Sequence, residues 1–324
     1  MPYLHRSLNL LVGLALAGVV AQTHALTVDL GAASNFSAVT FGNFTGLSGD
    51  TGSLLAVGGD ASLTNWQVNA NNMPLYGGRS LIVGGNFTGT DGGVVGSSFI
   101  GGTSTTSSFG LGSSPSIGAG TAASPFDFAA LQGQLQGTSA AAAAATPTGS
   151  VTYAGGSTQL TGTGSAVEVF AIDGAELSAD SFLQSLSGIN SDATVIFNVS
   201  GSSINLASFG FDLAGGSLQL NLLFNFYEAT SLSFANMAIE GAVLAPYAAV
   251  TGTSGHIGGT FVAQSFDSGE VGNFEFHDIN FIPVEVPTSA VPEPSPWMLL
   301  AGGLMACAFV SRRRRSDADA ASLS

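Results

Sequence analysis

The sequence predicts a mainly β protein: a single β-helix or solenoid-like domain with one flanking α-helix. Three observations predict this class: short apolar runs recur along the chain, glycine pairs follow several of them, and one motif returns without a gap farther along. Glycine is abundant, with 45 residues among 324. An antiparallel β-sandwich is the alternative, because it is also rich in short strands.

The segment 1–25 has the three parts of a secretory signal peptide. Arg6 supplies the positive charge, residues 8–20 are apolar, and residues 23–25 form a cleavage site with small residues. We expect cleavage after Ala25, which removes this segment from the folded protein.

The expected strands of the body are about four residues long, and Gly, Asn or Asp follows each of them closely. They lie at residues 54–57, 81–83, 167–170, 195–197 and 222–224. A coil of this size cannot bury its inward side chains alone, so we expect neighbouring coils to stack and share one core.

The repeats favour the solenoid over the sandwich. Residues 238–246 align without a gap on residues 256–264, so that Ala238 falls on His256. The element Val57-Gly-Gly-Asp60 returns as Val83-Gly-Gly-Asn86, and a third pair follows at residues 101–102. Glycine suits corners that need a positive φ or a close approach of two backbones. The alignment of residues 238–246 on 256–264 corresponds to a shift of 18 residues. The hairpins of a sandwich would not require a motif to return at a fixed shift.

One helix is expected after the first group of coils. Ser124 is the predicted N-cap, Pro125 the first helical residue and Asp127 a favourable first-turn charge. The apolar stripe consists of Phe128, Leu131 and Leu135. We expect the helix to continue through residues 140–145, to stop at Pro147 and Gly149, and to cover one flank of the solenoid. Residues 101–120, before it, are predicted to form a Gly/Ser/Thr-rich loop.

Composition excludes several classes of partner. The net charge is −15, only 8% of residues are charged, and lysine is absent. Five of the six arginines lie in the terminal segments, which leaves Arg79 as the only strong cation of the body. Nucleic-acid binding is excluded, because phosphate contacts need lysine or arginine. Cys307, the only cysteine, lies in the tail, so the body holds no disulfide.

The tail has three parts in order. A stiff Pro-Glu-Pro element at residues 292–294 comes first. The apolar residues 297–310 follow, and four arginines at residues 312–315 end the signal. As a helix the apolar part reaches about 21 Å, which is short for a permanent span of about 30 Å. The arginines should stay on the cytoplasmic side. An ordinary C-terminal transmembrane helix is the alternative. The residues of the two polar parts are Val291, Pro292, Glu293, Pro294, Arg312, Arg313, Arg314 and Arg315.

This tail resembles the PEP-CTERM sorting signal of Gram-negative bacteria. The resemblance implies transient anchoring in the inner membrane and cleavage near Pro292–Pro294 by exosortase, an integral-membrane protease. It also implies release to, or fixation at, the cell surface or the exopolysaccharide of the biofilm matrix. The resulting domain boundaries are 1–25 (signal peptide), 26–282 (body), 283–290 (linker), 291–315 (sorting segment) and 316–324 (short tail).

The body resembles the choice-of-anchor A family over nearly all of residues 26–281. The matching residues are 30–36, the two Val-Gly-Gly elements, 124–128, 225–230, 240–246 and 275–277. The resemblance implies an exported, adhesin-like surface protein with no established reaction. The expected layout of a β-helix and one helix is also similar to that of ice-binding proteins, a likeness of fold alone.

No catalytic or cofactor-binding residue is assigned. Polysaccharide lyases typically need a basic residue beside calcium, and Arg79 is the sole candidate. A glycosidase needs two carboxylates about 5–10 Å apart. Such a pair could come from Glu168, Asp173, Glu176 and Asp180. Acidic residues in loops are common, however, so we interpret these as structural or solvating.

The best metal-ligand constellation lies near the end of the body, and calcium is the first candidate ion. It consists of Glu275, His277 and Asp278, with Asp267 and Glu270 nearby. Alternation along a strand would put Glu275 and His277 on one face, opposite the adjacent phenylalanines. We prefer a structural role for this histidine, and we assign no metal. His256 has no obvious partner in the sequence.

The leading hypothesis is therefore a non-enzymatic exported protein, held at the cell envelope or in the extracellular matrix, whose flat faces bind polysaccharide or further copies. A carbohydrate-active β-helix enzyme is one alternative. An ice-binding-like surface protein is another, and it would need a regular Thr-x-Thr ladder. The pairs at residues 103/105, 161/163 and 251/253 are too scattered in the sequence to show one.

Overall fold

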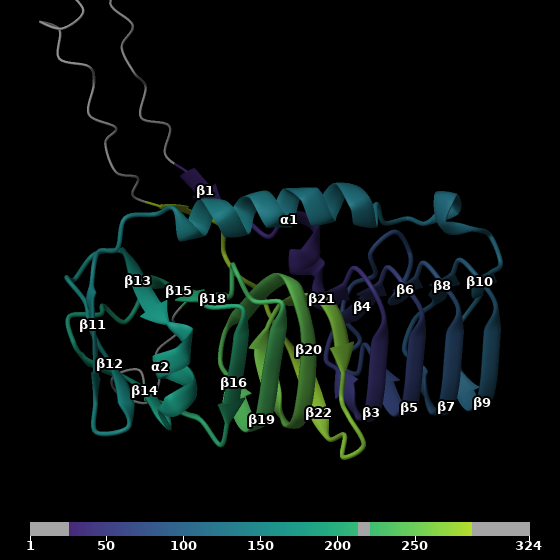
Figure 1. Cartoon of the computed structure of the whole chain (residues 1–324). Helices are drawn as coiled ribbons and strands as arrows, with labels where there is room; N and C mark the ends of the chain where they lie inside the picture. The colour runs from purple at the N-terminus through teal and green to yellow at the C-terminus, as the bar shows by residue number, and fades with distance from the viewer. Residues whose placement is uncertain (1–25, 213–220, 287–324) are drawn as a thin grey trace, which may run out of the picture. The chain divides into compact units, whose positions relative to one another are not determined.

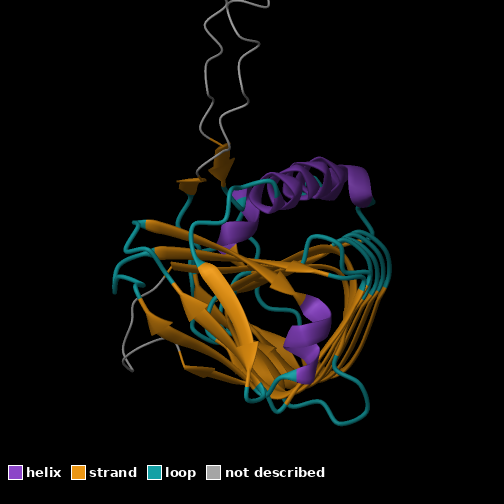
Figure 2. Ribbon diagram, turned by 60° about the vertical axis from the view of Figure 1, so that its left-hand side comes forward, coloured by secondary structure: helices purple, strands orange, loops and turns teal. Residues whose placement is uncertain are grey.

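The computed structural model describes residues 26–212 and 221–286. The predicted cleavage site at Ala25 and the sorting segment 291–315 lie outside the described residues. The described chain winds short parallel strands around a common interior, with one long helix along the outside (Figures 1 and 2). The predicted mainly β, solenoid-like fold class is confirmed.

The first layer of the solenoid is a continuous parallel sheet that runs the length of the molecule. Its strands follow one another in the hydrogen-bonded order β13 (Val167–Asp173), β15 (Thr194–Ser200), β18 (Asn221–Asn225), the start of β20 (Ala242–Gly259), the start of β21 (Phe261–Asp267), β2 (Phe36–Thr40), β4 (Leu54–Val57), β6 (Leu81–Val83), β8 (Ser98–Ile100) and β10 (Ser116–Ile117).

The second layer is also parallel and consists of longer strands. It contains β16 (Ser203–Ala207), β19 (Ser231–Ile239), the remainder of β20, the end of β21, β22 (Phe274–Ile279), β3 (Phe44–Thr51), β5 (Ala61–Val68), β7 (Phe87–Val94) and β9 (Ser104–Gly110).

Each long strand of this layer from β3 to β9 contains one residue in the left-handed region, at an equivalent position. In β3, β5, β7 and β9 these residues are Ser48 (φ 52°), Asn65 (φ 51°), Asp91 (φ 47°) and Ser108 (φ 53°). Short polar side chains tolerate this conformation better than β-branched ones. The extended backbone is therefore interrupted at the same point in these coils, and the layer is divided into two facets.

The glycine pairs form the corners between the two layers, as predicted. Close backbone approach explains them, since a Cβ on Gly84 would collide with the carbonyl oxygen of Gly58, and one on Gly101 with that of Gly84. The predicted registers are confirmed as well. Val57 pairs with Val83 across two first-layer strands. The alignment of residues 238–246 on 256–264 appears in the pairing of Ala238 with His256.

The interior between the layers is filled by large apolar side chains. Phe44, Trp66, Phe261, Phe266 and Phe276 are among the side chains buried there. The ring centroids of Phe44 and Phe266 lie 5.0 Å apart, although the two residues come from opposite ends of the chain. Buried aromatic pairs of this kind stabilise the stacking of coils beyond the area that they bury.

The order of coils in space differs from their order in the sequence. Residues 36–117 build outward from the middle of the molecule to one end. The long helix carries the chain back, and residues 167–279 build from the other end to the middle. There β21 pairs with β2 and β22 pairs with β3, so the last coil closes against the first.

The helix α1 (Phe128–Ala143) begins later than predicted. Its N-cap is Asp127, whose Oδ1 accepts a hydrogen bond from the N–H of Ala130 at 3.0 Å, so the prediction of Ser124 as N-cap is wrong. The Ser124 Oγ instead accepts from the N–H of Phe126 in a local turn. Phe126 is buried against Phe36, which holds the chain in that turn before the helix starts.

The predicted loop at residues 101–120 is also wrong in part, because it contains β9 and β10. Thr105 and Ser107 of β9 are exposed while Phe109 is buried, which is a strand pattern that the glycines obscured. A short helix, α2 (Gly174–Ala179), was not predicted. In the described part of the chain, no helix has both the length and the apolar character needed to cross a membrane.

The remaining elements close the ends and the connections. They are β1 (Leu26–Val28) with β23 (Val284–Val286), the 3-10 helices η1 (Gly31–Asn35) and η2 (Thr121–Ala123), and the sheet of β11 (Ser150–Ala154), β12 (Ser157–Thr161), β14 (Phe182–Ser187) and β17 (Gly210–Asp212). The strand β23 lies in the segment that the sequence places in the linker.

Candidate functional site

The second layer presents two parallel rows of hydroxyl side chains, one on β3, β5, β7 and β9 and the other on β5, β7 and β9. We call this surface the hydroxyl face. Neighbours in each row are paired across adjacent strands. The first row contains Thr45, Ser62, Thr88 and Thr105, and the second contains Thr64, Thr90 and Ser107.

The hydroxyl face follows from alternation along the strands. The residues between the hydroxyls point inward, and Phe44, Leu63 and Phe87 are buried there. Two inward positions are glycines because large rings occupy their space. A Cβ on Gly46 would lie 2.6 Å from Cε3 of Trp66, and one on Gly89 would lie 2.7 Å from Cγ of Phe109. The core therefore keeps this face flat.

The spacing of the rows is set by the sheet. Hydroxyls on adjacent strands are about 4.8 Å apart, and those two residues apart on one strand are about 6.7 Å apart. Each hydroxyl both donates and accepts hydrogen bonds. None of these seven residues on β3, β5, β7 and β9 is charged. The face is thus a neutral, regular array of hydrogen-bonding groups.

The first row continues beyond β3 onto the coils from the C-terminal half. The paired residues there are Asp267, Thr251, Ser233 and Asn205. The prediction that the threonine pairs are scattered is wrong for Thr105 and Thr251, which belong to one row, but Thr161 lies on β12 in the separate small sheet. The row is hidden in the sequence because its coils differ in length and because the chain enters the stack in its middle.

A ladder of side chains stiffens the corner that precedes the hydroxyl face. Asn43 Oδ1 accepts from the N–H of Asp60 at 3.0 Å, Asp60 Oδ1 accepts from the N–H of Asn86 at 2.7 Å, and Asn86 Oδ1 accepts from the N–H of Thr103 at 3.0 Å. Each side chain thus satisfies a backbone donor of the next coil. The hydroxyl rows start close to these anchors in the chain, so the ladder holds them in register.

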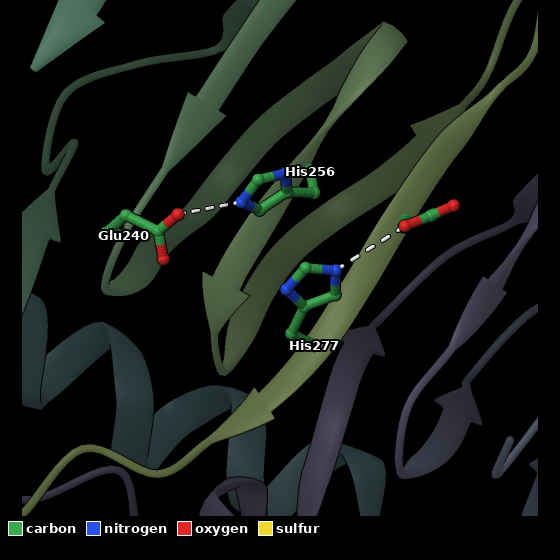
Figure 3. Close-up of polar contacts among 4 residues, drawn as sticks. Glu240, His256 and His277 are labelled. Carbon is green, nitrogen blue, oxygen red and sulfur yellow. Dashed lines mark hydrogen bonds and ion pairs between the residues drawn. The ribbon is translucent and has the colours of Figure 1, made fainter. Parts of the chain in front are cut away.

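Four polar residues gather farther along the second layer (Figure 3). His256 Nε2 lies 2.9 Å from Glu240 Oε1, and His277 Nε2 lies 3.5 Å from Glu275 Oε2. The two imidazole rings stack, with centroids 4.4 Å apart and planes inclined by 18°. His256, to which the sequence assigned no partner, therefore has two. The pairing of β19 with β20 brings Glu240 to His256, and the pairing of β20 with β22 brings His277.

Asp50 is paired with Glu275 on the adjacent strand. Burial raises the pKa of Asp50, the nearby Glu275 carboxylate raises it further, and His277 lowers it. Two carboxylates on one row repel each other, and the neighbouring histidine offsets part of that repulsion when it is protonated. This cluster brings carboxylates and imidazoles together at one place on the second layer.

The alternation predicted around His277 is confirmed, since Phe274 and Phe276 are buried while Glu275 and His277 are half-buried. Asp278, the third weak candidate for a metal ligand, is half-buried on the same strand. Among the described residues, no group of three or more His, Cys, Asp or Glu side chains is arranged to hold a metal ion.

The candidate catalytic carboxylates take structural roles. Glu168 is buried and accepts hydrogen bonds from neighbouring backbone and hydroxyl groups. Asp173 is the N-cap of α2, where its Oδ1 accepts from the N–H of Ala175 at 2.8 Å. Asp180 accepts from the hydroxyl of Thr158 at 2.8 Å. Glu176 lies in the first turn of α2.

Arg79, the candidate lyase base, fastens the loop after β9. Its Nη1 donates to Ser97 Oγ at 2.7 Å, to the carbonyl oxygen of Ser98 at 3.1 Å and to that of Ser114 at 2.9 Å. The guanidinium is thereby engaged within the fold.

A shallow pocket lies near the C-terminal end of α1 and contains two tyrosines, Tyr153 and Tyr227. Burial raises the pKa of both phenols. Other polar groups of the pocket are already engaged. The Tyr153 hydroxyl accepts from the N–H of Asp173 at 2.7 Å, and Asn198 Nδ2 donates to the carbonyl oxygen of Ala142 at 2.6 Å. The hydroxyl face therefore remains the stronger candidate site.

Comparisons with known proteins agree with this description. Residues 29–278 match a family model described as "Putative Ice-binding-like adhesive domain", and residues 290–315 match the PEP-CTERM protein-sorting motif. No curated protein and no solved structure matches the chain. The motif implies processing by exosortase and export to the cell surface, and no enzymatic family is indicated. The first match covers most of the chain, which therefore belongs to the family of ice-binding-like adhesive domains.

Proposed function

We propose that this protein is an adhesin that binds a neutral exopolysaccharide of its own cell surface through the hydroxyl face. The observation that carries the proposal is the pair of hydroxyl rows, one unbroken on β3, β5, β7 and β9 and the other on β5, β7 and β9. A rigid, flat array of groups that both donate and accept hydrogen bonds is complementary to the hydroxyls of a sugar chain.

Charge supports a neutral ligand over an acidic one. The body carries many carboxylates and a single strong cation, Arg79, which already donates to Ser97 and Ser114. An acidic polysaccharide would be repelled by this body, and no described lysine or arginine is free to pair with it. A neutral polysaccharide avoids that repulsion.

We further propose that the protein belongs with the choice-of-anchor A proteins and that it is held by the Gram-negative envelope or its matrix after exosortase has cut the tail. Deleting residues 312–315 should leave the protein anchored in the inner membrane or change where it accumulates. Cell fractionation with antibody detection measures this. An unchanged distribution between the fractions would contradict the sorting part of the proposal.

The binding proposal is tested by removing hydroxyls without changing shape. The double variant Thr88→Val, Thr105→Val removes two hydroxyls from the first row, and we expect affinity for the exopolysaccharide of the producing cells to fall about tenfold. Isothermal titration or co-sedimentation with the purified polysaccharide measures the loss.

The matched control is Thr152→Val, which removes an exposed strand hydroxyl on β11, outside the hydroxyl face. It should bind like the unmodified protein. If the double variant also binds with unchanged affinity, the hydroxyl face is not the adhesive surface. An equal loss in the control would point to a general effect of losing surface hydroxyls.

Ice binding is a second candidate, and the same two rows favour it. Ser62-x-Thr64, Thr88-x-Thr90 and Thr105-x-Ser107 lie side by side as three adjacent pairs of hydroxyls. Thermal hysteresis and changed ice-crystal shape, both lost in Thr88→Tyr, would support it. Binding to polysaccharide without thermal hysteresis would reject it.

A further inference from the structure

The strand β9 is the last strand of the second layer and has an open edge. It pairs with β7 on one side, and in the described part of the chain no strand pairs with its other side. Figure 1 shows β9 at the right-hand end of the row of strands, with no strand beyond it. Most of its residues are exposed.

The backbone groups at this edge can be assigned from one hydrogen bond. Phe87 donates its N–H to the carbonyl oxygen of Thr103 at 2.9 Å, so Thr103 faces β7. Because consecutive residues of a strand direct their N–H and C=O groups to opposite sides, Thr105 also faces β7. Ser104 and Thr106 therefore direct theirs to the open edge.

The usual protections of an edge strand are missing from β9. Its sequence, Ser104–Gly110, contains no charged residue and no proline. Its left-handed residue, Ser108, does not prevent pairing, because Asn65 and Asp91 occupy the same position in β5 and β7, which are paired on both sides.

Charge points to a second copy of this chain as the partner. Residues 92–126 contain no Asp, Glu, Lys, Arg or His, whereas the rest of the body is strongly acidic. Two acidic bodies repel each other, so an uncharged end is where they can approach closely. The strong charges next to this end are Asp91, which is exposed on β7 beside Ser108, and the cation Arg79, which contacts Ser114.

At the other end of the solenoid the last strand of each layer is covered, which favours a two-fold dimer over a fibre. Its last second-layer strand, β16, is covered by α2, where the N–H of Asn205 donates to Ser178 Oγ at 3.2 Å. The last strand of the first layer at this end is β13. The carbonyl oxygen of its Val169 accepts a hydrogen bond from the N–H of Thr148 at 3.0 Å. Within the second layer the open edge is therefore that of β9, and a contact between two β9 edges joins like ends. The strand β11 of the small sheet also pairs on one side alone, with β12, but it lies outside the two layers.

We propose that two copies of this protein associate through their β9 strands, in antiparallel register about a two-fold axis. The inference does not depend on the proposed ligand. The dimer would join two hydroxyl faces end to end and double the number of contacts with one extended polymer, which raises avidity.

The test is sedimentation velocity of the exported protein over a range of concentrations. We expect a monomer–dimer equilibrium that strengthens as salt rises, because salt screens the repulsion between acidic bodies. Thr106→Pro removes one outward N–H donor per copy and should weaken dimerisation about tenfold. The matched control Thr106→Val keeps the donor and should dimerise like the unmodified protein.

Hydrogen exchange gives a second measurement that does not depend on the variants. Protection of the Ser104 and Thr106 amides should increase with protein concentration, while that of the Thr105 amide should not. A monomer at every concentration, open filaments, or dimers that persist equally in Thr106→Pro would each overturn the proposal. Loss of dimerisation with retained polysaccharide binding would leave the proposed function intact.

Discussion

Glu168 shows how single residues stabilise an exported domain that has almost no cations. It is buried, yet it accepts hydrogen bonds from the Thr148 hydroxyl at 2.6 Å, the Thr163 N–H at 2.7 Å and the Ser165 N–H at 2.9 Å. Burial raises the pKa of this carboxyl, but these hydrogen bonds outweigh burial, and the pKa lies below its usual range.

The change Glu168→Gln should destabilise the protein by about 1–3 kcal/mol at pH 7. A carboxylate with a lowered folded-state pKa adds stability that is fully present above its unfolded pKa and is lost as the pH falls through the folded pKa. The difference between variant and unmodified protein should therefore shrink in acid. Urea unfolding at pH 7 and pH 3 measures it. The exposed Glu270→Gln should show no such difference, and an equal effect in both variants would contradict the prediction.

The Arg79 side chain also acts as a single residue, because its hydrogen bonds hold the loop after β9 against the preceding coil. Replacing it with Met removes three hydrogen bonds to Ser97, Ser98 and Ser114 while keeping an unbranched side chain. We expect faster proteolytic cleavage within residues 111–117 and a loss of about 2–3 kcal/mol of stability. Limited proteolysis followed by mass spectrometry tests this. The cleavage rate of Arg79→Lys should be intermediate. An unchanged cleavage rate in Arg79→Met would show that the Arg79 hydrogen bonds do not hold this loop.

At the scale of elements, α1 is fixed to the first layer by buried amides. Asn225 Oδ1 accepts from Ser139 Oγ at 2.6 Å, and its Nδ2 donates to the Ser139 carbonyl oxygen at 2.9 Å and to Asn198 Oδ1 at 2.8 Å. Asn198 in turn donates to the carbonyl oxygen of Ala142. These bonds set where the helix lies along an otherwise apolar contact.

The change Asn225→Leu should cost about 3 kcal/mol, because it leaves the Ser139 and Asn198 groups buried without partners. Guanidinium unfolding monitored by circular dichroism measures the cost. The control Asn205→Leu lies on the exposed side of β16 and should change the stability by about 0.5 kcal/mol or less. A similar small effect at Asn225 would mean that apolar packing alone positions α1.

At the scale of the whole molecule, the closure of the last coil on the first joins the two halves of the chain. Ala38 of β2 pairs with Phe261 of β21, and Thr51 of β3 pairs with Phe276 of β22. Solenoids whose coils contact only their neighbours in sequence can unfold from one end. Here neither half has a complete core without the other.

We therefore expect one cooperative thermal transition, with a ratio of calorimetric to van't Hoff enthalpy of about 1. The change Ala38→Asp places a charge in the buried junction and should lower the midpoint of that single transition. Differential scanning calorimetry tests both statements. Two separate transitions would show that the halves fold independently. So would an Ala38→Asp variant in which only part of the heat-absorption peak shifts to lower temperature.

The repeating unit of this protein follows from local features of the amino-acid sequence. The strands at residues 54–57 and 81–83 are predicted to the residue, and the glycine corners and the register of the repeated motif are present as expected. These features depend on neighbours in the chain: side-chain alternation, turn chemistry and the close approach of backbones at a corner. The start of α1 was misplaced, because the packing of Phe126 against Phe36 decided it.

Only the tertiary structure decided the order in which the coils stack, and with it the candidate site. The row that passes from Thr251 through Asp267 to Thr45 joins residues from opposite ends of the chain. The stacking of His277 on His256 and the open edge of β9 are likewise visible only in the structure. Pairing between distant strands leaves no period in the sequence, because each coil is compatible with several neighbours and long-range burial selects among them.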